Sequence, residues 1–293
     1  MLQPFALEEP TSVREASALL ARYGEAARLY AGGTELLLAM KEGLLHYDRL
    51  INIKTIAGLA DITRDADALR IGATATHRTL ERSPEVHTHF TAFTRLEAHV
   101  ANVRVRGTGT IGGNLCFAEP HADPGTLLQV YDARVKLARQ GSTRTLAIEA
   151  FFVGAFEVAL AEDELLTEIQ IPYLPAHTAA AYRKFGLLER PSVGVAVAVT
   201  ALPTGVQAVR IAVGCVGPTP RRIYEAETML SGKEIAAVRA GLPEAGELAG
   251  RAADAVSDLH GSADYKAYLV GVLLRRAFED AYQQAMAGEA TDG

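Results

Sequence analysis

The alternation of apolar and polar residues divides the chain into a short N-terminal unit, a longer strand-rich segment and a C-terminal part. Near the N-terminus, apolar runs at residues 5–7, 28–31 and 50–53 predict three short strands. Two helical patterns separate them, one opening at a capping box from Ser12 to Glu15 and one covering residues 34–41. Residues 1–55 are therefore predicted to form a small βαβαβ subdomain.

The segment from residue 56 to 173 is predicted to be a larger α+β subdomain. Its strands are expected at residues 69–73, 133–138, 143–148 and 166–171, and the middle two alternate around Gly141 as a hairpin does. Helical patterns are expected at residues 91–103 and 123–130. Between these two patterns lies a glycine-rich segment, residues 107–114, which we expect to be a loop.

The stretch from residue 172 to 178 is the best candidate for a linker, because it contains two prolines and shows no periodicity. Residues 179–293 are then predicted to form a second α+β domain. Three runs rich in β-branched residues, at 182–187, 193–201 and 206–213, predict a three-stranded sheet. Helices are expected to begin near Pro220, Glu234, Glu244 and Ala263, and the last of them has a continuous apolar face.

Charge and composition exclude several classes of function. The net charge of −6 and the scattered basic residues argue against a nucleic-acid binder. No long apolar run and no basic-then-apolar N-terminus are present, so we expect no membrane insertion and a cytoplasmic location. Two cysteines are too few for a disulfide framework, a four-cysteine zinc site or an iron–sulfur cluster held by this chain. We predict no metal site and, in the absence of a nucleophile–base pattern, no catalytic residue.

Two paired glycines stand beside hydroxyl residues, in Gly32-Gly33-Thr34 and in Thr110-Ile111-Gly112-Gly113. Glycines let backbone amides approach an anion closely, and the start of a helix adds to the attraction. Two such turns suit a ligand with two phosphates that is held from both sides, although ordinary tight turns are the alternative. Neither matches G-x-G-x-x-G or G-x-x-x-x-G-K-[ST], which disfavours a Rossmann fold and a P-loop.

Both segments carry a family resemblance. Residues 31–36 and 103–115 resemble the AGGTDL and QVRNxATIGGNL signatures of the FAD subunits of the xanthine dehydrogenase and carbon monoxide dehydrogenase group. The resemblance continues through residues 118–123, 168–172, 182–185, 217–222 and 262–266, and so covers essentially the whole chain. The chain departs from the pattern at Glu35, where Asp is commoner, at Gly107, where Asn is usual, and at Ser192, near a common acidic position. The absence of a four-cysteine insertion disfavours the hydroxybenzoyl-CoA reductase branch.

The resemblance implies an FAD-binding domain of the p-cresol methylhydroxylase and vanillyl-alcohol oxidase type, followed by a C-terminal domain of the CO dehydrogenase flavoprotein type. It implies an electron-transfer subunit of a molybdenum hydroxylase, which takes electrons from a 2Fe–2S subunit and passes them to NAD, a quinone or oxygen. Molybdopterin and 2Fe–2S clusters are expected only in a large and a small partner subunit, in a dimer of heterotrimers, that is, a heterohexamer. Two alternatives remain: a self-sufficient oxidoreductase of the vanillyl-alcohol oxidase type, and a scaffold subunit that has lost its cofactor.

By the same resemblance, both glycine loops hold the FAD diphosphate, Asp123 bonds the hydroxyl-bearing part, Leu166 packs on the ring system and Lys184 supplies positive charge. The alternatives are that Asp123 caps a helix and that Lys184 is a solvated lysine on an edge strand. The full set of predicted cofactor-binding residues is Leu29, Tyr30, Ala31, Gly32, Gly33, Thr34, Glu35, Leu36, Thr110, Ile111, Gly112, Gly113, Asn114, Asp123, Leu166 and Lys184.

Several other residues have simpler interpretations. Cys116 is expected to be a small buried apolar residue, and the pair of His87 and His89 to lie on the surface, since no acidic or thiol ligand stands near it. His121 lies near the second glycine segment and is the histidine of most interest. Residues 103–106 alternate valine and arginine, which fits a strand with one wet face as well as it fits contacts to phosphate or to a partner.

Overall fold

The computed structural model describes residues 2–186 and 190–289. The N-terminal subdomain is a parallel sheet in the order β1-β3-β2, formed by β1 (Ala6–Glu8), β2 (Ala27–Tyr30) and β3 (Arg49–Asn52). Helices α1 (Val13–Tyr23) and α2 (Leu36–Lys41) connect the strands, with 3₁₀ turns at Gly24–Ala26 and Ile53–Thr55. At the start of α1, Ser12 Oγ accepts the Glu15 N–H at 3.2 Å. The predicted βαβαβ unit is confirmed.

The second subdomain is built on a five-stranded antiparallel sheet in the order β4-β5-β10-β6-β7. Helices cover one face of this sheet, and apolar residues such as Ile71, Leu137 and Ile169 fill the space between them. The strands are β4 (Ile62–Arg64), β5 (Ala68–Gly72), β6 (Arg134–Arg139), β7 (Ser142–Ala147) and β10 (Leu165–Pro172), with a separate pair β8 (Phe152–Gly154) and β9 (Glu157–Val158). The helices are α3 (His77–Arg82), α4 (Pro84–His89), α5 (Thr91–Glu97), α6 (Val103–Thr108), α7 (Ile111–Phe117), α8 (Pro124–Val130) and α9 (Ile148–Phe151).

The prediction of one helix over residues 91–103 followed by a glycine-rich loop is wrong. Helix α5 ends at Glu97. Ala101 then has a left-handed backbone with φ 40°, and a right-handed helix cannot continue through a residue in that conformation. Asn102 then caps α6 through its Oδ1, and Thr110 caps α7 through its Oγ1. The residues of the glycine-rich segment are therefore mostly helical, and Arg104 and Arg106 lie on a helix instead of a strand.

The C-terminal part is a four-stranded antiparallel sheet backed by helices. The strands are β11 (Thr178–Phe185), β12 (Val193–Leu202), β13 (Gly205–Gly214) and β14 (Arg221–Arg222), and the helices are α10 (Tyr224–Leu230), α11 (Ile235–Ala252) and α12 (Ala263–Glu289). The sequence predicts three strands, because β14 is only two arginines long and makes no apolar run. Leu187, the predicted end of the first strand, lies outside the described residues.

The helices predicted to begin near Glu234 and Glu244 are one helix, α11, with Pro243 inside it. A proline in a helix removes one backbone donor, which is why the sequence suggests a break there. Buried residues before and after the proline, including Leu242, Ala245 and Ala249, pack in the same apolar cluster as Leu273 and Leu274 of α12. Packing against α12 therefore keeps α11 continuous across the proline.

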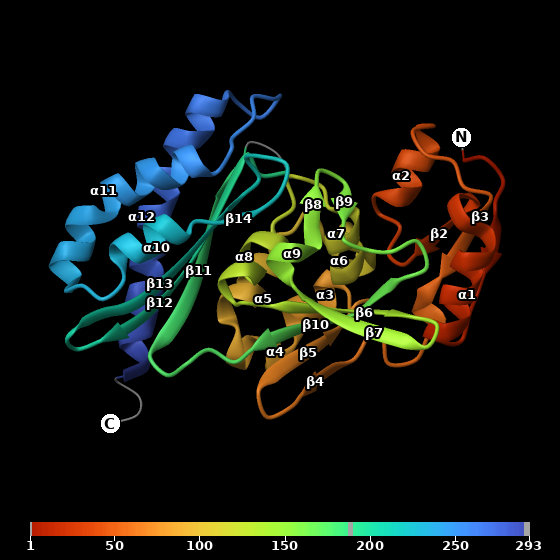
Figure 1. Ribbon diagram of the computed structural model, residues 1–293, viewed down its shortest axis with the longest axis horizontal. Helices are drawn as coiled ribbons and strands as arrows, with labels where there is room; N and C mark the ends of the chain where they lie inside the picture. The colour runs from red at the N-terminus through yellow and green to blue at the C-terminus, as the bar shows by residue number, and fades with distance from the viewer. Residues whose placement is uncertain (1, 187–189, 290–293) are drawn as a thin grey trace.

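Both faces of the C-terminal sheet are buried, and this joins the two main cores. Valines of β12 and β13 pack against α11 and α12, whereas Ala196, Ala198 and Ala212 on the opposite face belong to the core of the second subdomain. A Cβ on Gly214 would lie 1.9 Å from Thr126 Oγ1 of α8, so small residues are needed on this face. The close approach brings the start of α8 beside β11, and Figure 1 shows the second subdomain between the other two parts.

Candidate functional site

The two glycine segments, far apart in the sequence, are in direct contact. A Cβ on Gly32 would lie 2.5 Å from the carbonyl oxygen of Thr108 and 2.7 Å from the Cα of Gly109. Both neighbours are backbone atoms that no side-chain rotation can move, so only glycine fits at position 32. The first loop, between β2 and α2, therefore rests on the turn that precedes α7. Had the loops been separated, a ligand with two phosphates could not reach both.

The first loop has open backbone amides. No acceptor among the described residues is found for the N–H groups of Gly32, Gly33, Thr34 and Glu35, while Leu37 N–H already bonds Gly33 O at 3.0 Å. Gly33 has φ +71°, and a Cβ there would lie 2.5 Å from the Tyr30 ring. A run of unpaired amides before a helix is an arrangement that binds anions. The first loop thus offers the donors expected of it.

The second loop differs, and the expectation that its glycine amides are also free is wrong. Ile111 N–H donates to Ala75 O, and Gly112 N–H donates to Ala73 O, at 3.0 and 2.9 Å. Gly113 N–H donates to Thr110 Oγ1 at 3.1 Å. Gly112 is needed for packing, because a Cβ there would lie 2.6 Å from the Cβ of Ala73. The Thr110 hydroxyl proton is a donor that the cap does not use.

Asp123 and Lys184, predicted separately, meet in the structure. Lys184 Nζ donates to Asp123 Oδ2 at 2.8 Å and to His99 O at 2.8 Å, and Tyr182 Oη donates to Asp123 Oδ1 at 2.7 Å. The Asp123 side chain is 4% exposed and that of Lys184 is 26% exposed. Burial raises the pKa of Asp123, and the charge and hydrogen bond of Lys184 act against this rise.

The alternative interpretations of these two residues are not borne out. Asp123 stands at the N-cap position of α8, but its carboxylate makes no hydrogen bond to that helix. Lys184 does lie on β11, an edge strand, yet its ammonium group is held in an ion pair and is not freely solvated. Sequence reasoning missed Tyr182 as the third member of this group. The position of Tyr182, two residues before Lys184 on the same strand, is the signal that places both side chains on one face.

A chain of alternating charges runs along the edge of the site. Arg190 Nη2 lies 3.1 Å from Glu35 of the first loop, and Arg190 Nη1 lies 3.2 Å from Glu119, which follows α7. His121 Nδ1 lies 3.0 Å from the same Glu119 oxygen. The side chain of Glu35 is thus tied to the C-terminal domain. Nothing in the local sequence signals Arg190 or Glu119.

The charge chain continues from His121 into the C-terminal domain. His121 Nε2 lies 3.1 Å from Asp258 Oδ2, and Lys266 Nζ lies 2.6 Å from the same oxygen. The hydrogen bond to Glu119 raises the pKa of His121 against the effect of burial. Lys266 is 0% exposed. The six residues from Glu35 to Lys266 therefore link all three parts of the chain around the glycine loops.

The remaining predicted residues are less informative. Leu166 is 3% exposed and lies in the core of the second subdomain, and Asn114 Oδ1 is buried without a partner among the described residues. Cys116 is half-buried, and the removal of its thiol from water raises the pKa of the thiol to about 12, which leaves no reactive thiolate at neutral pH. His87 is exposed and His89 is half-buried against Tyr173. Arg106 is held by Glu81 at 3.1 Å.

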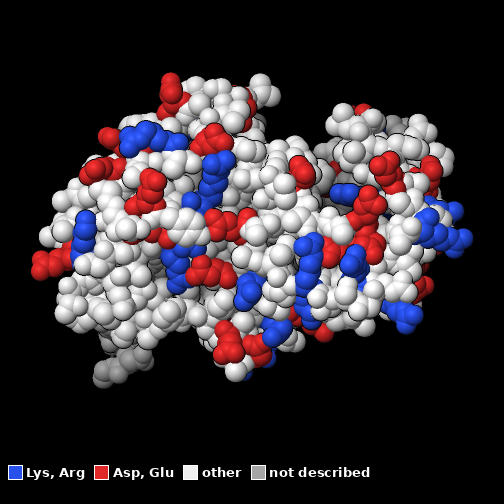
Figure 2. All heavy atoms as spheres, viewed as in Figure 1, with Lys and Arg blue, Asp and Glu red and all other residues white. Residues whose placement is uncertain are grey.

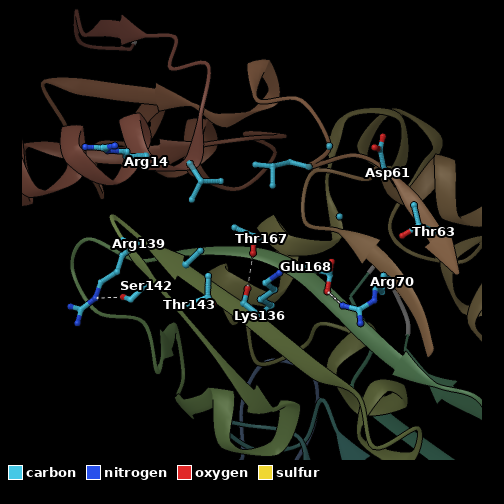
Figure 3. Close-up of a pocket in the computed structure, with 16 residues that line it drawn as sticks. Arg14, Asp61, Thr63, Arg70, Lys136, Arg139, Ser142, Thr143, Thr167 and Glu168 are labelled. Carbon is cyan, nitrogen blue, oxygen red and sulfur yellow. Dashed lines mark hydrogen bonds and ion pairs between the residues drawn. The ribbon is translucent and has the colours of Figure 1, made fainter. Parts of the chain in front are cut away.

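A large cleft lies away from the glycine loops. A cleft of about 690 Å³ lies between α1 and the polar face of the five-stranded sheet. Figure 3 shows Lys136 and Thr167 on the sheet opposite the helix that carries Arg14, and Arg70 paired with Glu168. None of the predicted cofactor-binding residues lines this cleft. The cleft is therefore separate from the site built by the loops.

Other surface features are mixed. On the face seen in Figure 2, Lys and Arg alternate with Asp and Glu over all three parts of the chain. Within residues 2–186 and 190–289, no cluster of three or more His, Cys, Asp or Glu is placed to hold a metal ion. No helix in the same two ranges has both the length and the apolar character needed to cross a membrane.

Comparison with known proteins decides the family. Residues 3–174 match the FAD binding domain in molybdopterin dehydrogenase, and residues 190–281 match the CO dehydrogenase flavoprotein C-terminal domain. The chain belongs to the molybdopterin dehydrogenase FAD-binding family. Within this family it is 32% identical to the carbon monoxide dehydrogenase medium chain of Hydrogenophaga pseudoflava, over 96% of this chain and 99% of that protein. It is 30% identical to the nicotine 6-hydroxylase medium subunit of Paenarthrobacter nicotinovorans, over 93% and 95%.

Solved structures of the family have the same fold over nearly the whole chain. A carbon monoxide dehydrogenase chain from Hydrogenophaga pseudoflava superimposes with a TM-score of 0.92, covering 97% of this chain and 99% of that one at 32% identity. A chain of quinoline 2-oxidoreductase from Pseudomonas putida 86 superimposes with a TM-score of 0.91, covering 98% and 99% at 27% identity. The described residues fit an FAD of this family, because they combine a loop of open amides, a glycine cradle and a buried carboxylate held by Tyr182 and Lys184.

Proposed function

We propose that this chain is the FAD-binding electron-transfer subunit of a molybdenum hydroxylase complex. The observation that carries this function is the contact between Gly32 and the Thr108–Gly109 turn, which joins the loop with four open amides to the segment that precedes α7. A diphosphate is the part of FAD that such donors recognise. Relatives over nearly the full chain are the medium subunits of dehydrogenase and hydroxylase complexes, which supports the same function.

The residues proposed to hold the cofactor are divided by task. Residues 29–36 supply backbone donors for the diphosphate, and residues 110–114 supply the Thr110 hydroxyl and the wall on which the first loop rests. Asp123, fixed by Tyr182 and Lys184, accepts hydroxyl hydrogen bonds, while Lys184 adds positive charge beside it. Leu166 contributes apolar packing next to the ring. When bound, FAD would supply the exchange between one-electron and two-electron transfer, and the protein would bind, orient and shield it.

We further propose the partners. A large subunit would carry the molybdenum cofactor and choose the organic substrate, and a small subunit would carry 2Fe–2S clusters that deliver electrons to this chain. The relatives named as medium chains or subunits support such a division of labour. A dimer of heterotrimers is the proposed stoichiometry, and the cytoplasmic location stays a prediction.

The test is purification of the native complex through an affinity tag on this chain. We expect a yellow-brown preparation with a large and a small partner identified by mass spectrometry, and FAD released on denaturation in a ratio of about one per chain. A colourless preparation that releases no flavin would overturn the proposal. Steady turnover of a small organic substrate by the isolated chain would favour a self-sufficient oxidoreductase instead.

A further inference from the structure

A buried histidine–carboxylate pair lies behind the contact between the two glycine loops. His77 begins α3 and Glu97 ends α5, and they are 2% and 0% exposed. His77 Nδ1 lies 2.6 Å from Glu97 Oε2. Burying two ionisable groups costs free energy that apolar side chains of similar size would not cost. The pair is absent from the set of residues that the family resemblance assigns to the cofactor.

The imidazole lies beside Gly109, at the contact between the two loops. The backbone N–H of His77 donates to Gly109 O at 3.1 Å, next to the backbone on which Gly32 rests. A Cβ built on Gly109 would lie 3.3 Å from His77 Cδ2 and 3.4 Å from Thr34 Oγ1, so the ring and the first-loop hydroxyl approach the same point. Because Nδ1 faces Glu97, the opposite edge of the ring, with Cδ2 and Nε2, faces the junction of the loops.

The carboxylate of Glu97 engages one ring nitrogen of His77, Nδ1, and leaves the other, Nε2, for a different partner. Glu97 Oε1 has no hydrogen-bond partner among the described residues, so His77 provides the compensation for this buried charge. No hydrogen-bond partner for Nε2 lies in the part of the chain that the structure describes, so Nε2 is the ring nitrogen left to donate to an anion. The charge of His77 also reaches Asp123, where it acts with Lys184 against the rise in pKa that burial causes.

A bound diphosphate would need a positive charge that the two glycine loops do not supply. Neither residues 31–36 nor residues 107–114 contain a lysine or an arginine, and four amides of the second loop are already used within the protein. A diphosphate carries two negative charges, which neutral amides compensate only in part.

We propose that His77 is a further binding residue for the anionic diphosphate of the cofactor, presenting Nε2–H at the junction of the loops, and that Glu97 positions it. This inference rests on the proposed function, since the ligand is the diphosphate of FAD. Glu97 contacts the imidazole and acts on the ligand only through it.

The experiment uses the full-length chain stripped of flavin, with FAD, ADP and riboflavin as three separate probes in calorimetric titrations. His77→Gln is expected to weaken binding of FAD and of ADP about tenfold, the loss typical of one charge-assisted hydrogen bond. Binding of riboflavin, which has no phosphate, should not change. His87→Gln, on the exposed face of α4, is the matched control and should bind all three probes as the parent chain does.

The outcomes separate this inference from the proposed function. If the parent chain does not bind FAD, the proposed function fails; if it binds FAD and H77Q binds FAD and ADP equally well, only the role of His77 fails. Glu97→Gln should lose part of the same affinity, and the H77Q/E97Q double variant should lose no more than H77Q. Should H77Q not fold, selective ¹⁵N labelling of histidine in the parent chain decides. The His77 Nε2 resonance is expected to shift when ADP is added, and an unchanged resonance would overturn the proposal.

Discussion

Lys184 Nζ lies 2.8 Å from Asp123 Oδ2, and this ion pair joins the start of α8 to an edge strand of the C-terminal sheet. The two residues come from different parts of the chain, and their contact depends on the small residues that let α8 approach β12 and β13. The pair therefore fixes both the geometry of the proposed cofactor site and the docking of the two cores. Replacing Lys184 and replacing Asp123 should change the stability of the protein by different amounts.

Removal of Lys184 should cost more stability than removal of the Asp123 charge. Lys184→Met leaves a carboxylate that is 4% exposed without its cation, so we expect a loss of about 3 kcal/mol in the free energy of unfolding. Asp123→Asn leaves an ammonium group that is 26% exposed and can turn to water, so the loss should be smaller. Urea unfolding of the flavin-free chain measures both. In the K184M/D123N double variant part of the stability lost in K184M should be recovered. If the losses of the two single variants simply added, the pairing of Lys184 with Asp123 would be contradicted.

Gly32 is the position where a single methyl group should separate the loops. In Gly32→Ala the new Cβ would meet Thr108 O at 2.5 Å, a backbone atom, so we expect a loss of about 1–3 kcal/mol and weak FAD binding. Gly107→Ala is the matched control, because a Cβ there meets nothing within 4 Å and the residue lies inside α6. The control should be neutral or more stable by about 0.5–1 kcal/mol. Equal FAD affinity in both variants would contradict the contact.

His121 should make stability depend on pH near neutrality. Its folded pKa is raised above the ordinary value of 6.5, chiefly by the hydrogen bond to Glu119. A raised folded pKa gives stability that is fully present below the unfolded value and is lost as the pH rises through the folded value. The difference in unfolding free energy between the parent chain and His121→Gln should therefore shrink as the pH is raised from about 6.

The acidic neighbours of His121 should act in the opposite direction, at lower pH. Burial acts to raise the pKa of Glu119, but the hydrogen bond of His121 and the charge of Arg190 lower it overall. Asp258, where Lys266 and His121 outweigh burial, has a pKa of about 2. Their contributions are present above the unfolded pKa values and are lost on acidification. A difference between the parent chain and H121Q that stayed constant over the whole range would contradict the charge chain.

Lys266 provides a separate test, because its side chain is fully buried while Asp258 is 30% exposed. Asp258→Asn leaves the buried ammonium group without its carboxylate, and we expect a loss of about 3–5 kcal/mol. Lys266→Met places an apolar side chain of similar length in the same space and leaves Asp258 able to reach water, so the loss should be smaller. Thermal and urea unfolding of the two variants show which of them loses more stability. A greater loss in K266M than in D258N would show that the ammonium group is solvated.

The sequence by itself determined the local structure wherever a residue acts on its near neighbours. The capping box at Ser12, the parallel N-terminal unit and the alternating strands all follow from contacts within a few residues. Gly32 and Gly33 were identifiable because such turns need residues without a Cβ. The family resemblance added Asp123 and Lys184 as separate positions, without their contact.

Tertiary structure decided which of these groups remain available to a ligand. A backbone amide is available to a ligand only if no acceptor within the protein already bonds its N–H group. For Ile111 and Gly112 the acceptors are the carbonyl oxygens of Ala75 and Ala73, which folding brings close. The same holds for charged groups. Arg190, Glu119 and the His77–Glu97 pair could not be recognised from the sequence, because their ion-pair partners lie far away along the chain. Hydrogen bonds and ion pairs act over about 3 Å in space, whatever the separation along the chain, so local patterns could not reveal them.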